Sequence, residues 1–321
     1  MRAISFDGSE PRLEDVPTPE PGPGEALIRM VRAGVTRTDS DICKGLLGFR
    51  GVLGHEFVGV VEAVGGRDED GWTGKRVVGG AGTYCGRCPL CQAGLSEHCR
   101  ERTLLGQSGR DGCLAERFLL PVRNLVELPP AIDDDCGVFA EPLASAVQAA
   151  RQLTIEGKPY ITVLGDGALG LLMVQVMAKL NASVRLIGRS PAKLAICEKW
   201  QIKHRPVDEI GRRADQDVVV DCSGTADGLA LALEMVRPRG TVLIKSLLDA
   251  SSGGVDLTPL VLNEIRLIGS HRGPIGEAVS LLARGEVDVA SLISRRMSLE
   301  DGPAVLAASR GDDVVKVLVH P

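Results

Sequence analysis

The stretch of residues 160–180, YITVLGDGALGLLMVQVMAKL, decides the fold of the second half of this chain. Its first five residues are mostly apolar and lead into a glycine, which predicts a buried strand. The residues from Ala168 onward form an apolar segment long enough for a helix. Between them lies the pattern G-x-G-x-x-G, and a strand before it with a helix after it is the context in which this pattern binds a dinucleotide.

Each glycine of the pattern has a physical role. Gly165 permits a tight turn, Gly167 lets the backbone approach a pyrophosphate, and Gly170 lets the helix pack closely on the strand. Ala168 and Leu169 open the helix, whose free N–H groups and positive dipole end attract phosphate. We therefore expect these five residues to hold the phosphates of a nicotinamide dinucleotide.

Strands and helices continue to alternate downstream. The expected strands are Val184–Ile187, Asp217–Cys222, Gly240–Lys245 and Ile265–Ile268, with helices starting near Ser190-Pro191 and at Ala226. Uniformly apolar strands separated by helices indicate a parallel sheet covered on both faces. Residues 142–276 are therefore predicted to form a doubly wound, Rossmann-type α/β domain.

The end of the second strand selects between the two dinucleotides. A carboxylate there binds the ribose 2′-hydroxyl of NAD(H), whereas a cation accommodates the 2′-phosphate of NADP(H). This chain has Gly188, Arg189 and Ser190 at that point, which offer a guanidinium and a hydroxyl. We therefore expect NADP(H) to be favoured over NAD(H), the alternative being that Arg189 is only a solvated loop cation.

The first part of the chain has a different sequence pattern. Short β segments broken by Pro and Gly are expected at Ala26–Arg32, Glu56–Val64, Arg76–Val78 and Ala115–Leu120. The run PTPEPGPG at 17–24 is unsuited to a sheet and is expected to be a surface connection. This pattern indicates an irregular β-barrel. Val314–Val319 is expected to return to it as a strand, so the barrel domain is predicted to comprise residues 1–141 and 277–321.

Four cysteines are closely spaced in CGRCPLCQAGLSEHC, at Cys85, Cys88, Cys91 and Cys99. Two-residue gaps let successive thiolates turn toward one point, and the longer gap closes a loop around it. Four thiolates make a closed tetrahedral zinc site, which is structural because no position is left for water. The alternatives are an iron–sulfur cluster and four unliganded cysteines. We expect a structural zinc lobe at residues 85–99.

Composition narrows the function. The 321 residues carry a net charge of −5, and only five Phe, two Trp and two Tyr are present, which argues against a nucleic-acid surface. We expect no signal peptide, because the N-terminus alternates apolar and polar residues, and no membrane span. Nine cysteines without secretory context favour a reducing compartment, with the cytoplasm as the default.

Several motifs then occur in a fixed order: Gly54–Glu62 (GHEFVGVVE), the cysteine lobe, Glu141–Ala144 (EPLA) and the glycine loop. Together they resemble the zinc-dependent medium-chain alcohol dehydrogenases, especially a subgroup with sorbitol- and threonine-dehydrogenase-like features, over essentially the whole chain. The resemblance implies a GroES-like catalytic domain beside the Rossmann domain. It also implies hydride transfer between a primary or secondary alcohol or polyol and NADP(H) or NAD(H), in a homodimer or homotetramer.

The resemblance further implies a catalytic zinc in the cleft between the domains, with His55, Glu56 and Glu141 matching its ligands. Other readings are that Glu141 caps the following helix and that Glu56 pairs with a buried Arg. Thr36 departs from the family, which has a cysteine ligand there, and a hydroxyl is a much poorer zinc ligand than a thiolate. Cys43 lies seven residues further on and is more simply explained as packing than as a substitute ligand.

The same resemblance implies roles for residues that follow Thr36. Thr38 matches the hydroxyl that relays the alcohol proton, and Asp39 matches the acid that orients a ligand. Arg37 matches a residue within reach of the pyrophosphate, or is a surface charge. Asp41 either ends the proton relay or is a surface carboxylate.

Two other functions remain open at this point. One is a zinc-independent reductase of the same fold, for which His55, Glu56 and Glu141 would have no use. The other is a catalytically silent NADPH-binding protein whose metal site has decayed through Thr36. The sequence does not define the substrate. The strand at Ile265–Ile268 is expected to be an exposed sheet edge that could pair across a two-fold axis.

Overall fold

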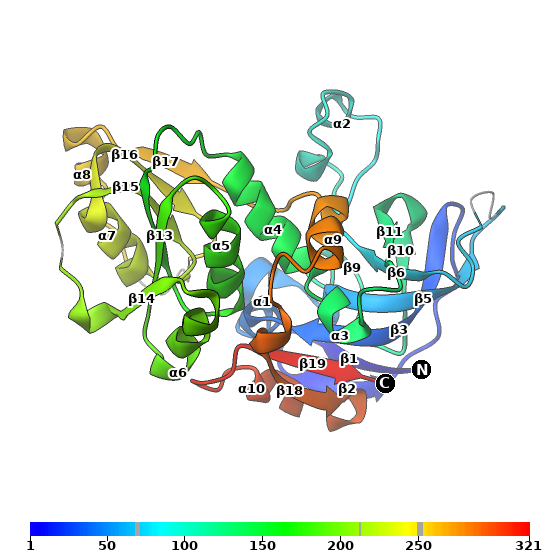
Figure 1. Ribbon diagram of the computed structural model, residues 1–321. Coiled ribbons are helices and arrows are strands. Elements are labelled where there is room, and N and C mark those ends of the chain that lie inside the picture. The colour runs from blue at the N-terminus through cyan, green and yellow to red at the C-terminus, as the bar shows by residue number, and fades with distance from the viewer. Residues whose placement is uncertain (68–70, 212, 249–252) are drawn as a thin grey trace. The chain divides into compact units, whose positions relative to one another are not determined.

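The computed structural model describes residues 1–67, 71–211, 213–248 and 253–321. Within this part of the chain the fold divides into two compact units. The first comprises Met1–Glu141 and Ile275–Pro321, and the second comprises Pro142–Pro274. Figure 1 shows their strands and helices, and each unit is described here by itself.

The first unit is built around a seven-stranded sheet in which β3 (Glu25–Val35) is central. The strand order is β11-β6-β5-β3-β19-β18, and β10 also pairs with β3. These strands are β5 (Glu56–Val64), β6 (Arg76–Gly79), β10 (Arg117–Pro121), β11 (Leu125–Glu127), β18 (Ile293–Ser298) and β19 (Lys316–His320). β19 pairs antiparallel with β3, so the last strand of the chain joins the sheet that contains β3 and β5.

Two smaller sheets complete the first unit. One has the order β2-β1-β4, from β1 (Arg2–Phe6), β2 (Pro11–Asp15) and β4 (Gly51–Val52). The other has the order β7-β8-β9, from β7 (Gly82–Thr83), β8 (Thr103–Leu105) and β9 (Gly109–Arg110). The helices are α1 (Arg37–Ile42), α2 (Pro89–Gln92), α3 (Asp134–Gly137), α9 (Ile275–Ala283) and α10 (Ala304–Ala308).

The core of the first unit lies beneath β3 and its neighbours. Phe57 of β5 meets Phe118 of β10 edge to face, with ring centroids 4.7 Å apart, and both side chains are buried. Burying an aromatic side chain of this size contributes about 1.5–3 kcal/mol. Because β5 begins at Glu56, this packing also fixes the backbone from which the site residues project.

The second unit holds a six-stranded, entirely parallel sheet with the order β14-β13-β12-β15-β16-β17. Its strands are β12 (Tyr160–Leu164), β13 (Ser183–Gly188), β14 (Lys203–Pro206), β15 (Gln216–Asp221), β16 (Val236–Ile244) and β17 (Arg266–Gly269). Its helices are α5 (Ala168–Ala178), α6 (Pro191–Leu194), α7 (Ala226–Met235) and α8 (Thr258–Leu262), and α4 (Ala140–Arg151) leads into it.

The predicted fold class, a barrel-like β unit with a Rossmann-type parallel sheet, is confirmed. The strands expected at Glu56–Val64 and Tyr160–Leu164 have those bounds. The run at 17–24 contains no strand, but Pro23 forms an isolated bridge with Gly65, so its separation from the sheet is less complete than predicted. Among the described residues, no helix is long and apolar enough to cross a membrane.

Candidate functional site

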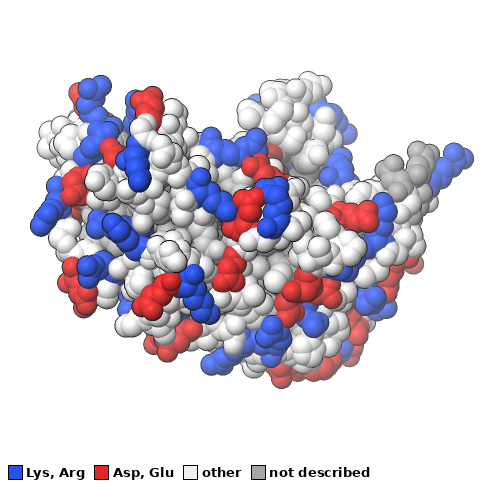
Figure 2. Space-filling model, viewed as in Figure 1, with Lys and Arg blue, Asp and Glu red and all other residues white. Residues whose placement is uncertain are grey.

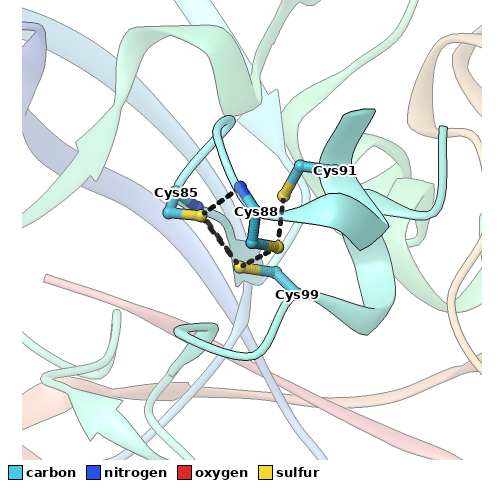
Figure 3. Close-up of side chains that lie close together, drawn as sticks. All are labelled: Cys85, Cys88, Cys91 and Cys99. Atoms are coloured by element: carbon cyan, nitrogen blue, oxygen red, sulfur yellow. Dashed lines mark hydrogen bonds between the residues drawn. The ribbon is translucent and has the colours of Figure 1, made fainter. Parts of the chain in front are cut away.

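The four cysteines of residues 85–99 point toward one another (Figure 3). The Sγ of Cys88 lies 3.5 Å from that of Cys91 and 3.8 Å from that of Cys99. The Sγ atoms of Cys99 and Cys85 are 3.6 Å apart. Thiolates bound to zinc at about 2.3 Å define a regular tetrahedron with edges of about 3.8 Å. The cage therefore has the size of a single tetrahedral ion, and a cluster of several iron atoms needs a wider one.

Backbone N–H groups of the lobe are turned toward the sulfur atoms. The N–H of Cys88 donates to Cys85 Sγ at 3.3 Å, and those of Cys85 and Glu101 donate to Cys99 Sγ at 3.4 and 3.3 Å. Backbone hydrogen bonds lower the pKa of Cys85 and lower that of Cys88 to about 6. Since the thiolate is the form that binds metal, the fold prepares these cysteines for an ion. Burial acts in the opposite direction on Cys91 and raises its pKa to about 11.

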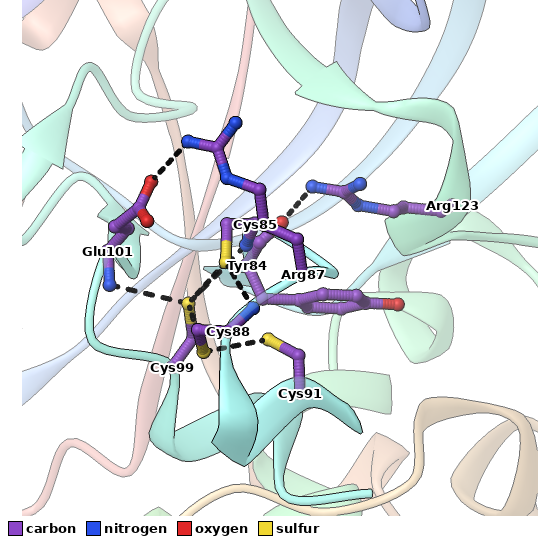
Figure 4. Close-up of polar contacts among 8 residues, drawn as sticks. All are labelled: Tyr84, Cys85, Arg87, Cys88, Cys91, Cys99, Glu101 and Arg123. Atoms are coloured by element: carbon purple, nitrogen blue, oxygen red, sulfur yellow. Dashed lines mark hydrogen bonds and ion pairs between the residues drawn. The ribbon is translucent and has the colours of Figure 1, made fainter. Parts of the chain in front are cut away.

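Contacts outside the sulfur cage hold the lobe in shape (Figure 4). Arg87 forms an ion pair with Glu101 at 3.0 Å, which ties together the two ends of the cysteine segment. The guanidinium of Arg123 lies 4.6 Å from the centre of the Tyr84 ring and donates to the Tyr84 carbonyl. Pro89 begins the short helix α2 at a position where its missing N–H costs nothing.

A second group of side chains that could hold a metal ion lies in the same unit. The ligand atoms of His55, Glu56 and Glu141 all lie within 4.8 Å of one another. His55 directly precedes β5, Glu56 is its first residue, and Glu141 is in the first turn of α4. His55 and Glu56 are buried, and Glu141 is half-buried. The structure thus brings together the three residues that the resemblance implies as ligands, and carboxylates and imidazole are a donor set that divalent ions accept.

Glu56 also has a protein partner that the sequence did not reveal. Lys316 Nζ lies 2.6 Å from Glu56 Oε2, and the two side chains are only 3% and 4% exposed. The ammonium also lies 5.7 Å from the centre of the Phe139 ring. Burial raises the pKa of Glu56, and the charge of Lys316 works against that rise. The alternative reading of Glu56, a pair with a buried Arg, has the right kind of partner but the wrong residue, because the cation is a Lys. Its sign in the sequence is a single charged residue inside the apolar run VVKVLV.

His55 is held from its other side by Asp39. The Asp39 carboxylate is fully buried, and its Oδ1 lies 3.5 Å from His55 Nδ1. Burial lowers the pKa of His55, but Asp39 together with the charges of Glu141 and Glu56 more than offsets this, so the pKa lies above its ordinary value. Because Nδ1 faces Asp39, Nε2 is the ring nitrogen that remains for a ligand.

Thr36 is used as a helix cap. Its hydroxyl accepts a hydrogen bond from the Asp39 backbone N–H at 3.2 Å and donates to Asp39 Oδ2 at 2.7 Å. The Thr36 N–H donates to the same oxygen, which completes a capping box at the start of α1. Cys43 ends this helix, burial raises its thiol pKa to about 11, and it is not part of the metal-ligating group.

The other residues of α1 that the resemblance singles out, apart from Asp39, are exposed or half-buried. Arg37 is exposed and pairs with Asp41 at 3.5 Å, and Lys44 pairs with the same carboxylate at 3.5 Å. Thr38 is half-buried. Exposed pairs of this kind contribute little to stability, about 0–1 kcal/mol, so Asp41 behaves as a surface carboxylate in this structure.

The glycine loop of the second unit has the geometry that its sequence predicts. Gly165 has φ +106°, and a Cβ there would lie 2.9 Å from the Cys222 backbone. A Cβ at Gly170 would lie 1.8 Å from the Gly165 carbonyl oxygen, so helix α5 and strand β12 approach closely only because residue 170 is glycine. Gly167 is exposed with open space beside it, and it is the N-cap from which Ala168 and Leu169 continue into α5.

The turn after β13 is bound to this glycine loop by Asp166, a residue that the sequence did not single out. Its Oδ2 accepts hydrogen bonds from the backbone N–H groups of Arg189 and Ser190 at 2.6 and 2.7 Å. Ser190 caps α6 by accepting from the Lys193 N–H at 3.3 Å. A Cβ at Gly188 would lie 2.5 Å from Asp166. In the sequence, the only sign of this contact was that an aspartate stands between the first two glycines of the pattern.

Comparison with known proteins gives this arrangement a family. Residues 22–130 match the alcohol dehydrogenase GroES-like domain, and residues 168–284 match the zinc-binding dehydrogenase domain. The chain is 28% identical over 328 residues to the L-threonine 3-dehydrogenase of Chelativorans sp. strain BNC1, with 96% of this chain and 94% of that relative covered.

Two solved structures are similar over the whole chain. A candidate zinc-binding dehydrogenase of Sinorhizobium meliloti 1021, bound to NADP, is 31% identical with a TM-score of 0.88, and the match covers 100% of this chain and 99% of that one. The alcohol dehydrogenase of Thermus sp. ATN1 is 28% identical with a TM-score of 0.89, and again 100% and 99% are covered. The chain belongs to the zinc-type medium-chain dehydrogenase/reductase family.

It is therefore an oxidoreductase of the NAD(P)-dependent alcohol dehydrogenase type, with zinc and NAD(P)(H) as its cofactors and alcohols as its substrate class. This confirms the predicted enzyme class, and neither a silent NADPH-binding protein nor a zinc-independent reductase is favoured. Basic and acidic side chains are interspersed on the face shown in Figure 2, which has no continuous basic patch among the described residues.

The cysteine lobe generates the first prediction. Replacing Cys91 with serine removes one of four thiolates, so the variant is expected to lose one zinc ion per chain and to unfold at lower temperature. Zinc per chain, measured by atomic emission, and a thermal melt test this. Cys136→Ser is the matched control, because Cys136 is a half-buried cysteine outside both metal-ligating groups. Unchanged zinc content in Cys91→Ser would show that the lobe holds no ion.

The buried ion pair generates the second prediction. Lys316→Met leaves Glu56 without its cation in a buried position, and we expect the free energy of unfolding to fall by about 3–5 kcal/mol. Urea denaturation measures this. The double variant Lys316→Met/Glu56→Gln removes both charges and should recover part of the loss, because no uncompensated carboxylate remains. Equal losses in the single and double variants would contradict a direct coupling between Lys316 and Glu56.

Proposed function

We propose that this enzyme oxidises a small primary or secondary alcohol or a polyol, and reduces the corresponding carbonyl, at a metal site formed by His55, Glu56 and Glu141. The observation that carries the proposal is the convergence of these three donor groups within 4.8 Å of one another. A zinc ion bound there would polarise the alcohol oxygen and stabilise the developing alkoxide while hydride passes to the nicotinamide. The name of the threonine 3-dehydrogenase relative supports a secondary alcohol as one candidate substrate.

In this proposal the buried residues set the orientation of the ligands. Asp39 faces His55 Nδ1 and thereby presents Nε2, which is the arrangement that commonly accompanies a metal-bound histidine. Lys316 binds Glu56 Oε2, so Glu56 has its other oxygen for an ion, or swings between the ion and Lys316. Glu141 is the less buried ligand and lies at the start of a helix, whose positive dipole end stabilises its charge.

Because residue 36 provides no thiolate, the proposed site has only nitrogen and oxygen ligands, which are harder donors than sulfur. Thr36 is committed to the cap of α1, so three ligands remain, two of them carboxylates. Three protein ligands are enough for a catalytic zinc, which keeps an open position for water or substrate. Oxygen ligands bind zinc less selectively than thiolate does, so we propose a more loosely held ion than in a site with cysteine at residue 36.

Other residues of α1 have proposed roles beside the metal. The Thr38 hydroxyl relays the alcohol proton, and Arg37 reaches toward the pyrophosphate when it leaves Asp41. For the cofactor, we propose that Gly165, Gly167, Ala168, Leu169 and Gly170 bind the phosphates, on the strength of the loop geometry. Gly188, Arg189 and Ser190 are proposed to favour NADP(H) over NAD(H), and the NADP bound to the Sinorhizobium meliloti relative supports this.

Measuring metal content together with turnover tests the function. The purified protein is expected to hold two zinc ions per chain and to reduce NADP⁺ in the presence of at least one member of a panel of secondary alcohols and polyols. Glu141→Ala should lose the second ion and most of the turnover while keeping the ion of the cysteine lobe. One ion with cofactor binding and no turnover on any alcohol would contradict the proposal.

Thr36→Cys extends the same experiment. If residue 36 faces the ion, the new thiolate adds a fourth ligand, so the affinity for the second zinc ion should rise by about tenfold or more. Competition with a chromogenic chelator measures that affinity. Thr36→Ser is the control, because it keeps a capping hydroxyl without a sulfur. An unchanged affinity in Thr36→Cys would show that residue 36 is not at a ligand position.

We further propose that the enzyme is a cytoplasmic homodimer. Strand β17 is at the edge of its sheet, and Val261 and Leu262, which precede it, are 80% and 75% exposed. An exposed edge strand beside apolar side chains is a template for pairing with a second copy across a two-fold axis. The nine cysteines form no disulfide among the described residues, which supports a reducing compartment.

The dimer is tested by placing charge on this surface. The double variant Val261→Glu/Leu262→Glu should shift the protein from dimer to monomer in sedimentation velocity at micromolar concentration, because the carboxylates would have to be buried without partners. Leu95→Glu, at a 48% exposed leucine of the cysteine lobe, is the control and should leave the mass unchanged. A monomeric starting protein, or a variant that remains dimeric, would disprove this interface.

A further inference from the structure

The structure places a carboxylate at the end of β13, although no acidic residue lies there in the sequence. Asp166 comes from the glycine loop after β12, and its side chain lies against Gly188, the last residue of β13. A Cβ on residue 188 would meet both Cβ and Oδ2 of Asp166 at 2.5 Å. Asp166 therefore fills the space that a side chain on residue 188 would otherwise occupy.

This position has a known importance in a Rossmann fold. The residues that end the second strand distinguish the ribose 2′-hydroxyl of NAD(H) from the 2′-phosphate of NADP(H), and an acid there favours the hydroxyl. Arg189 provides the opposite charge at the same turn, and its side chain has no ion pair among the described residues. The end of β13 thus has one group suited to each cofactor. Asp166 suits the 2′-hydroxyl of NAD(H), and Arg189 suits the 2′-phosphate of NADP(H).

Asp166 also uses the backbone donors of the turn. The N–H groups of Arg189 and Ser190 both point at Asp166 Oδ2, at 2.6 and 2.7 Å. Two adjacent N–H groups are well suited to an anion such as a phosphate. In this chain they are already satisfied by an internal anion, so a 2′-phosphate would meet a negative charge where it could otherwise gain two hydrogen bonds.

We propose that Asp166 is a specificity-determining residue that limits the preference of this enzyme for NADP(H) over NAD(H). The proposal rests on the cofactor assignment given above, in which Arg189 favours NADP(H). Asp166 opposes Arg189 by charge and by occupying two donors, so the preference for NADP(H) is smaller than Arg189 alone would give. Its side chain acts in cofactor binding, and no step of hydride transfer depends on it.

Asp166→Asn tests the proposal, because asparagine keeps an oxygen that accepts the two N–H groups and removes only the charge. The dissociation constants of NADPH and NADH are measured by quenching of protein fluorescence, and those of 2′,5′-ADP and 5′-ADP by calorimetry. Asp166→Asn should bind NADPH and 2′,5′-ADP roughly tenfold more tightly, with NADH and 5′-ADP within about twofold of the unaltered protein. Asp166→Ala also frees both donors and should shift the preference at least as far.

The matched control is Arg189→Ala, which should weaken NADPH by about tenfold and leave NADH unchanged. Unchanged or weaker NADPH binding in Asp166→Asn would overturn the role of Asp166. So would a preference of more than about a hundredfold for NADPH in the unaltered protein, which can be measured even if a variant does not fold. Failure of the unaltered protein to bind either cofactor would instead overturn the assignment of the glycine loop.

Discussion

The first unit is organised around the need to neutralise carboxylates in its interior. Glu56 and Asp39 are both almost fully buried, and an ionised carboxylate in a protein interior requires a cation or several hydrogen bonds. The two acids meet this requirement differently. Glu56 takes its cation from Lys316 on the last strand, whereas Asp39 accepts from the Thr36 cap and faces His55. The chain therefore brings its C-terminal strand back beside β3 for an electrostatic reason as well as for sheet pairing.

The sequence predicts the parts of this fold that depend on local pattern. The glycine loop and the cysteine cage follow from residue spacing, because each is formed by residues close together in the chain. The parallel sheet follows from the alternation of apolar strands with helices, although its paired strands are far apart in sequence. His55 and Glu56 were also identifiable, since they are adjacent and lie in a recognisable run. Lys316 was not, because its partner is 260 residues away and only the three-dimensional sheet brings them together. Long-range pairs of this kind leave no periodic signal, although a lone lysine in an apolar strand already requires a partner.

Asp166 shows a second way in which sequence reasoning falls short. The rule for cofactor choice is stated for a residue at the end of the second strand, and read along the chain it finds no acid. In the structure, the side chain of Asp166 in the glycine loop reaches the same place, because Gly188 leaves room for it. A motif position described only as "x" thus bears on the choice of cofactor. The rule concerns a location in the fold. A carboxylate can reach that location either from a residue at the end of the second strand or from a residue of the glycine loop.

Thr36 is explained by the same electrostatic constraint. A cysteine at residue 36 would offer a thiolate, but it would be a poorer cap for α1 and a poorer donor to Asp39 than the hydroxyl in this structure. The hydroxyl stabilises the buried Asp39 carboxylate, and Asp39 in turn orients His55. Residue 36 would therefore support the proposed metal site indirectly, through the acid that faces His55. In the proposed site of two carboxylates and one histidine, Thr36 thus acts through Asp39 and His55 and not as a ligand.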